Sequence, residues 1–302
     1  MLEIEIKAKG VESIVDYDLS QITEEEVTIR CVNISVRFIT PCLNIKKFII
    51  EGNIGTKIIY DPDQHQDTSN NDVSLSFFGD KIEEFNFFGN TLSPNIISAI
   101  SNASNLQILR LQMFDGTRYN LENLPSSVHT LDDYEDKYYI NQDKSSIKNL
   151  IGCYGATIDF SAFKYLETIK YREWCKFTYD SPSVMNNLKE MSTISISQSC
   201  FNLSFPILTK LKIVFISDEY DIDQLEDSIN KMIANSPRLI AIRFRFFTIS
   251  KGNMFLSLNS TETCKNVYVC IDKNVDFNIN YDDRDKHDVC ITRYYIESRF
   301  NS

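Results

Sequence analysis

Glycine is scarce in this sequence, with only 9 residues in a chain of 302. Phosphate-binding loops use glycine because its missing side chain lets backbone N–H groups approach a phosphate closely. Neither a GxxxxGK(S/T) pattern nor a GxGxxG pattern occurs, and no GxSxG turn presents a nucleophilic serine. We therefore predict that the protein is not an enzyme, and we assign no catalytic residues and no cofactor.

Metal-ligand spacing is also missing. The eight cysteines form no CxxC pair, and the three histidines, His65, His129 and His287, lie far from one another in the sequence. Zinc sites need closely spaced thiolates and imidazoles, and none of the acidic clusters has the mid-loop glycine of a calcium-binding EF-hand. We predict no metal site, and we expect reduced cysteines that act as small apolar residues in a reducing compartment.

Positive charge is the minority charge, with 31 Lys and Arg against 42 Asp and Glu, a net charge of -11 and a pI of about 4.9. The negative net charge repels nucleic acid and anionic membranes at long range and disfavours them as partners of the protein as a whole. No apolar run approaches the roughly 20 residues that span a bilayer. The first residues alternate like a strand and do not resemble a signal peptide, so we expect a cytoplasmic protein.

A short unit occurs twice in the carboxyl-terminal half. The segments that begin at Leu208 and Leu239 both place apolar residues at relative positions 0, 3, 5 and 8, and the later ones alternate as in a strand with one buried face. Residues 221–233 between them have helical apolar spacing. A strand, loop, helix and strand in about 30 residues is a unit that stacks on copies of itself.

Further copies occur along most of the chain. Copies of varying quality start at residues 45, 82, 106, 128, 147, 166, 191, 208, 239 and 264. Residues 1–9 predict a first strand, residues 10–24 a polar connection, residues 61–72 a polar insertion loop, and Ser93-Pro94 the start of a helix. Four of the nine intervals between these starts fall in the range of about 20–29 residues that is typical of leucine-rich repeats, and two more, of 19 residues, lie just below it.

These copies give the chain a resemblance to irregular leucine-rich repeat (LRR) proteins, including the short-repeat variants of protists and bacteria. Ile, Phe, Val and Tyr often stand where the pattern L-x-x-L-x-L-x-x-N has leucine. The resemblance implies an α/β fold: a curved horseshoe solenoid with a parallel β-sheet on its concave face and helices or irregular turns on its convex face. We expect one domain, 1–302, with a cap at 1–24 and about twelve irregular repeats over 25–295.

The predicted concave face is the candidate binding surface, because family members use it mostly for protein recognition. Relative positions 2, 4 and 6 should face outward there, and across six copies these 18 positions include seven basic and no acidic residues. The predicted partner-binding residues are Arg110, Lys170, Arg172, Lys210, Lys212, Arg243 and Arg245. Long cationic side chains are also ordinary residents of exposed strands, so the bias has a purely structural alternative.

The sequence leaves several functions open. The first is a non-enzymatic, intracellular adaptor, scaffold or regulatory subunit that binds an acidic or phosphorylated protein segment on the concave face. Alternatives are a substrate-recognition subunit associated with a ubiquitin ligase, and a nucleic-acid binder that uses the local basic residues. The sequence does not determine the partner or the oligomeric state.

Overall fold

The computed structural model describes most of the chain, and its residues fall into two compact units, unit 1 (Met1–Ile147) and unit 2 (Lys148–Ser302). The described residues are 1–7, 14–61, 76–113, 124–133, 146–152, 157–159, 163–170, 176–178, 185–194, 204–215, 222–246, 253–258, 266–272, 276–281 and 288–294. The predicted insertion loop therefore lies outside the described residues, apart from Asp61.

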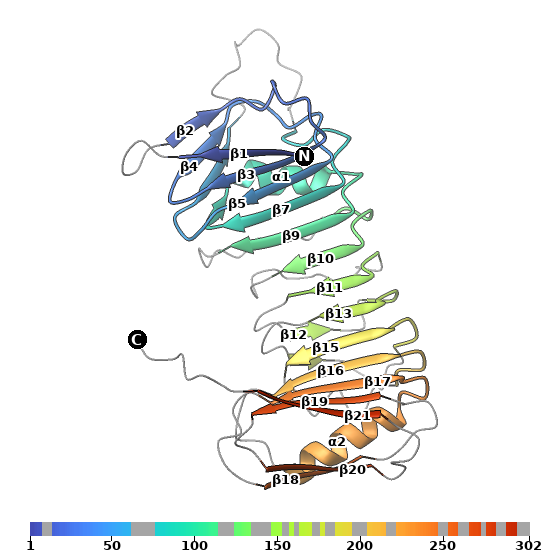
Figure 1. Ribbon diagram of the computed structural model, residues 1–302. Coiled ribbons are helices and arrows are strands. Elements are labelled where there is room, and N and C mark those ends of the chain that lie inside the picture. The colour runs from blue at the N-terminus through green and yellow to red at the C-terminus, as the bar shows by residue number, and fades with distance from the viewer. Residues whose placement is uncertain are drawn as a thin grey trace. The chain divides into compact units, whose positions relative to one another are not determined.

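Unit 1 is built on a parallel sheet whose strands follow one another in the order of the chain (Figure 1). The strands are β1 (Leu2–Ile6), β3 (Glu26–Cys31), β5 (Lys47–Glu51), β7 (Glu84–Gly89), β9 (Ile108–Met113) and β10 (Thr130–Asp133). Their register aligns the apolar residues, so that Ile29, Ile50 and Phe87 are neighbours across β3, β5 and β7. Alternation then buries one face of the sheet and leaves the other open.

A second parallel sheet lies across the core of unit 1. Its strands are β2 (Ile14–Tyr17), β4 (Ser35–Phe38), β6 (Lys57–Tyr60) and β8 (Thr91–Leu92). Phe38 of β4 reaches Phe48 of β5, with ring centroids 5.9 Å apart, so the two sheets share one core. The expected polar connection at 10–24 therefore contains a strand, β2, which is too short to give a clear alternation in the sequence.

The predicted helix at Ser93-Pro94 is confirmed as α1 (Pro94–Asn102), which buries Ile96 and Ile100. Pro94 takes the first helical position, where its missing N–H costs no hydrogen bond. Ser93 occupies the N-cap position, but its Oγ does not cap the helix and instead accepts a hydrogen bond from the backbone N–H of Tyr60 at 3.0 Å. This bond ties the start of α1 to β6.

Unit 2 repeats the parallel arrangement with longer strands toward its carboxyl-terminal end. Its main sheet contains β11 (Asn149–Ile151), β13 (Thr168–Lys170), β15 (Glu190–Ile194), β16 (Lys210–Phe215), β17 (Ala241–Phe246), β19 (Asn266–Asp272) and β21 (Asp288–Tyr294). Two parallel pairs accompany it, β12 (Thr157–Asp159) with β14 (Lys176–Thr178) and β18 (Asn253–Leu258) with β20 (Asp276–Tyr281). The predicted helix at 221–233 is confirmed as α2 (Ile222–Ala234).

Each unit is a parallel β-solenoid, which confirms the repeat architecture predicted from the apolar spacing. The described residues contain only two helices, α1 and α2, and unit 1 has a second sheet where the repeat family implies helices or irregular turns. Neither helix is long and apolar enough to cross a membrane, as far as the described residues extend.

Candidate functional site

The open face of unit 2 carries a row of polar and charged side chains at equivalent positions on neighbouring strands. Lys170, Ser192, Lys212, Arg243 and Tyr268 are Cα partners in successive strand pairs from β13 to β19. We call these five residues the basic row. Because parallel neighbours in register stand about 4.8 Å apart, one ligand can contact several of them at once.

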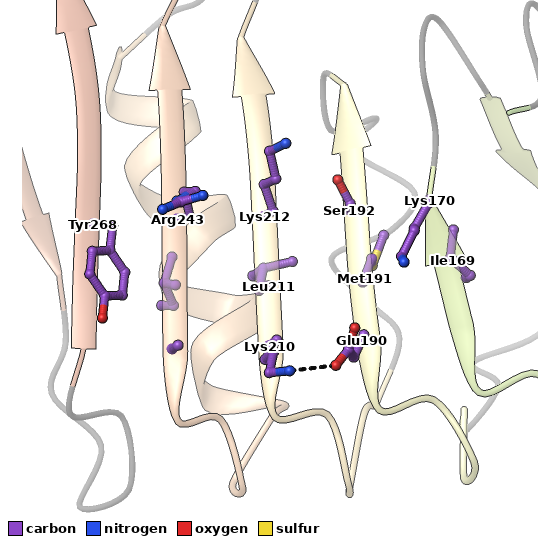
Figure 2. A pocket seen from close by; sticks show the side chains of 12 residues that line it. Ile169, Lys170, Glu190, Met191, Ser192, Lys210, Leu211, Lys212, Arg243 and Tyr268 are labelled. Atoms are coloured by element: carbon purple, nitrogen blue, oxygen red, sulfur yellow. Dashed lines mark hydrogen bonds and ion pairs between the residues drawn. The ribbon is translucent and has the colours of Figure 1, made fainter. Parts of the chain in front are cut away.

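A second row precedes the basic row by two residues on each strand and contains a charge of the opposite sign. Glu190 on β15 faces Lys210 on β16, and the Lys210 Nζ lies 2.6 Å from the Glu190 Oε1 (Figure 2). Lys210, a predicted binding residue, therefore already has a carboxylate partner. The sequence placed no acidic residue on this face, so Glu190 was missed.

The cause of this omission is a register error in one copy. The apolar spacing in the sequence puts the start of that copy at Met191, but Met191 pairs with Ile169 and Leu211, which occupy relative position 3 of their own copies. The copy therefore starts at Leu188, which is fully buried. Thr193 fills a position that is apolar in the other copies, so the frame beginning at Met191 gave the better apolar match in the sequence.

The basic row lines a hollow of about 630 Å³ on the open face. Lys170, Lys212, Arg243 and Tyr268 contribute long side chains to its lining, and Figure 2 shows them spaced across neighbouring strands with the short side chain of Ser192 between Lys170 and Lys212. Ala241 contributes a second short side chain to the lining. Apolar residues such as Ile169, Met191, Leu211 and Ile242 lie beneath it. The hollow is thus a shallow, cation-rimmed depression over an ordered sheet, of a size that suits a side chain of a bound segment.

Three cations of the basic row have no carboxylate partner among the residues that the structure describes: Lys170, Lys212 and Arg243. The Arg243 guanidinium lies over the ring of Tyr268, 5.6 Å from its centroid. This cation–π contact restrains the Arg243 side chain and adds no carboxylate partner to it from the part of the chain that the structure describes. The hollow therefore has a local positive charge in a chain of net charge -11.

Arg110, the predicted binding residue of unit 1, is in a different environment. Its Nη1 donates a hydrogen bond to the Glu84 carboxylate, and the Lys47 Nζ lies 3.2 Å from the other oxygen of Glu84. Burial raises the pKa of Glu84, but hydrogen bonds from Asn86 and Lys47 and the charges of Lys47 and Arg110 outweigh burial and lower the pKa below its usual value. Arg110 is therefore a compensated charge.

The seven predicted binding residues lie in different parts of the protein. Lys170, Lys210, Lys212 and Arg243 lie together on the open face of unit 2, whereas Arg110 belongs to unit 1. Arg245 lies on β17 in register with Val214 and Cys270, but its side chain is not described, and Arg172 lies outside the described residues. The binding role of all of them stays a prediction.

Within the described ranges, no three His, Cys, Asp or Glu residues cluster as metal ligands would. Cys31 and Cys42 are free and buried. Burial raises the pKa of the Cys31 thiol to about 11, despite a hydrogen bond with Thr56 that acts in the opposite direction, and burial also raises the pKa of Cys42. Thiols of this kind are poor nucleophiles, because the thiolate is the reactive form.

No protein-family model, curated protein or solved structure matches the chain. Ser192 and Tyr268 join the predicted lysines and arginine as lining residues. Aligning Met191 with Leu211 and Ile169 in the sequence would have placed Glu190 and Ser192 on the open face.

Proposed function

We propose that the protein is a non-enzymatic interaction module that binds an acidic or phosphorylated protein segment on the open face of unit 2. One observation carries this proposal: Lys170, Lys212 and Arg243 line one hollow and have no carboxylate partner among the described residues. Cations left uncompensated in an acidic protein attract a complementary anionic partner and select against other partners.

The architecture supports the same proposal. A solenoid leaves one face of its parallel sheet available along many strands, and a partner segment can lie across them. The hollow interrupts this face, so one anionic side chain of the segment can enter it while the rest of the segment crosses neighbouring strands. The partner would supply acidic groups, and Arg243 would offer a fork of N–H donors to them.

We infer that the solenoid is of the leucine-rich repeat kind. Ile45, Phe48 and Ile50 are buried at positions 0, 3 and 5 of their copy. Asn53 stands at position 8, where its Oδ1 accepts a hydrogen bond from the backbone N–H of Asn33 at 3.0 Å. An asparagine at this position satisfies backbone groups where the strand turns away. Unit 1, with its second sheet, would be a β-rich variant of the family.

The test compares two triple variants of the full chain that change net charge equally. The first carries Lys170→Ser, Lys212→Ser and Arg243→Ser. The second, the control, carries Arg30→Ser, Arg37→Ser and Lys46→Ser in unit 1, where each cation has a carboxylate partner. The probe is a labelled oligoglutamate peptide, and the measurement is fluorescence anisotropy at several salt concentrations, with folding checked by circular dichroism.

We expect the first variant to bind at least about tenfold more weakly than the control and to lose most of the salt dependence of binding. Equal affinity of the two folded variants would overturn the proposal, because binding would then follow net charge rather than the hollow. A role in substrate recognition for a ubiquitin ligase would use the same face and stays a separate prediction.

A further inference from the structure

The basic row contains a short hydroxyl side chain between two lysines. Ser192 on β15 lies in register with Lys170 on β13 on one side and Lys212 on β16 on the other. The two lysine backbones are therefore separated by about two strand spacings, or roughly 10 Å. Each lysine carries its ammonium group on a flexible four-carbon stem, so both ammonium groups can reach an anion placed above Ser192.

The geometry points to a phosphorylated serine or threonine of a partner protein as the ligand of this hollow, with its phosphate above Ser192, between Lys170 and Lys212. The inference rests on the proposed function and names the chemical group that the segment presents. Figure 2 shows Lys170 leaning from β13 toward β15, and the Ser192 hydroxyl lying on the same face as Lys212. Arg243 and Tyr268 border the hollow beyond Lys212.

The number of donors favours a phosphate over a carboxylate. A phosphoserine carries a charge of about -1.5 to -2 and three strong acceptor oxygens, whereas a carboxylate carries one charge and two oxygens. In the neighbouring row a single lysine, Lys210, is enough to pair with the carboxylate of Glu190. Besides the ion pair of Lys210 with Glu190, the lining of the hollow offers three cations and a hydroxyl, and its arginine is already restrained by the contact with Tyr268.

The surrounding charge favours a single phosphate over a polyanion. Glu190 lies two residues before Ser192 on the same strand and the same face, so a chain of phosphates that runs along β15 would meet a carboxylate. The net charge of -11 adds long-range repulsion to any nucleic acid. An isolated phosphate within a protein segment avoids both penalties.

The first experiment uses the full chain and three degenerate peptide pools with the same flanking composition. The central residue is phosphoserine in one pool, glutamate in the second and serine in the third. Labelled oligouridylate serves as a nucleic-acid probe, and fluorescence anisotropy measures each affinity. We expect the phosphoserine pool to bind at least about tenfold more tightly than the glutamate pool.

A matched pair of variants tests the location. Ser192→Glu places a carboxylate between the two lysines, whereas Gln112→Glu adds the same charge to the open face of unit 1. Both positions are partly exposed, so both variants are expected to fold, as circular dichroism would verify. Ser192→Glu should remove the preference for phosphoserine, and Gln112→Glu should keep it.

The outcomes separate this inference from the proposed function. Equal binding of the phosphoserine and glutamate pools, lost in the Lys170, Lys212 and Arg243 triple variant, would overturn the phosphate inference and support the proposed function. Binding of no peptide pool would overturn both. Tighter binding of oligouridylate than of the phosphoserine pool would overturn both in favour of nucleic acid. A preference for phosphoserine that the Ser192→Glu variant retains would overturn the placement of the phosphate above Ser192.

Discussion

The open faces of the two units carry basic side chains in different surroundings. In unit 1, Arg30 lies between Glu3 and Glu51, at 3.0 and 2.8 Å, and Arg110 bonds to Glu84. In unit 2, the described partners of the basic row include no carboxylate for Lys170, Lys212 or Arg243. Parallel strands in register bring equivalent positions together in both units. Whether a cation is free for a ligand therefore depends on the residue that the register places beside it.

The interiors of the two units differ as well. Unit 1 closes its core with a second sheet, and Phe77 lies at the centre of an aromatic cluster with Phe38, Phe48, Tyr60 and Phe78. In unit 2, part of the core is supplied by α2, whose Ile229, Met232 and Ile233 are fully buried. Aromatic rings bury large areas and gain from edge-to-face contacts, so we expect unit 1 to depend on a few large side chains.

The largest expected effect tests this dependence. Phe77→Ala removes a ring that is 1% exposed and contacts aromatic rings on both sheets. We expect it to lower the free energy of unfolding by about 3–5 kcal/mol, because it combines lost burial with a cavity. Urea unfolding measured by circular dichroism checks the change. Ile54→Ala, at a residue that is 70% exposed, should change stability by less than about 0.5 kcal/mol, and an equal effect of the two variants would contradict this view of the core.

A smaller effect on the free energy of unfolding is expected for a substitution in the turn that follows β5. The Oδ1 of Asn53 accepts hydrogen bonds from the backbone N–H groups of Asn33 and Gly55, at 3.0 and 3.1 Å. Asn53→Ala leaves these donors without that acceptor and should cost about 1–3 kcal/mol. Asn44→Ala is the control, because the exposed side chain of Asn44 accepts a long hydrogen bond, of 3.4 Å, from the Lys81 Nζ. Urea midpoints that shift equally in both variants would show that Asn53 has no special structural role.

The buried positions of the solenoid could be predicted from the sequence. Ile82, Phe85 and Phe87 are spaced as a strand with one buried face requires, and each is at most 2% exposed. This spacing is local, so a single sequence carries it. The same reasoning predicted α1 and α2, because a proline at the first helical position and helical apolar spacing are also local signals.

The second sheet and the charge pairs could not be predicted in the same way. The strand β2 has four residues, too few to distinguish alternation from chance. The partner of Arg110 is Glu84, on the preceding strand of the sheet, and that pairing depends on a register between segments that are separated in the sequence. An error of three residues at Met191 was enough to hide Glu190 and Ser192. Site chemistry on a repeat protein therefore requires the register, which local patterns determine only copy by copy.

The variant with the smallest expected effect on stability is Glu84→Gln, which would make the open face of unit 1 resemble that of unit 2. Glu84→Gln removes the carboxylate that compensates Lys47 and Arg110, and we expect it to cost about 1 kcal/mol or less at neutral pH. The freed cations should also make unit 1 bind oligoglutamate, measured by anisotropy in the background of the Lys170, Lys212 and Arg243 triple variant. No gain of binding in that background would show that removing compensation is insufficient to create a site.

The pH dependence of stability gives an independent measure of the same carboxylate. The pKa of Glu84 is lowered in the folded protein, so its ionised form stabilises the fold above the unfolded value of about 4.3. This contribution is lost as the pH falls from there through the lowered folded pKa. In urea unfolding at a series of pH values, the wild type should therefore lose more stability in this acid range than Glu84→Gln. Parallel curves would mean that the ion pairs of Glu84 with Lys47 and Arg110 do not stabilise the fold. The two open faces would then differ only in the number of their basic residues.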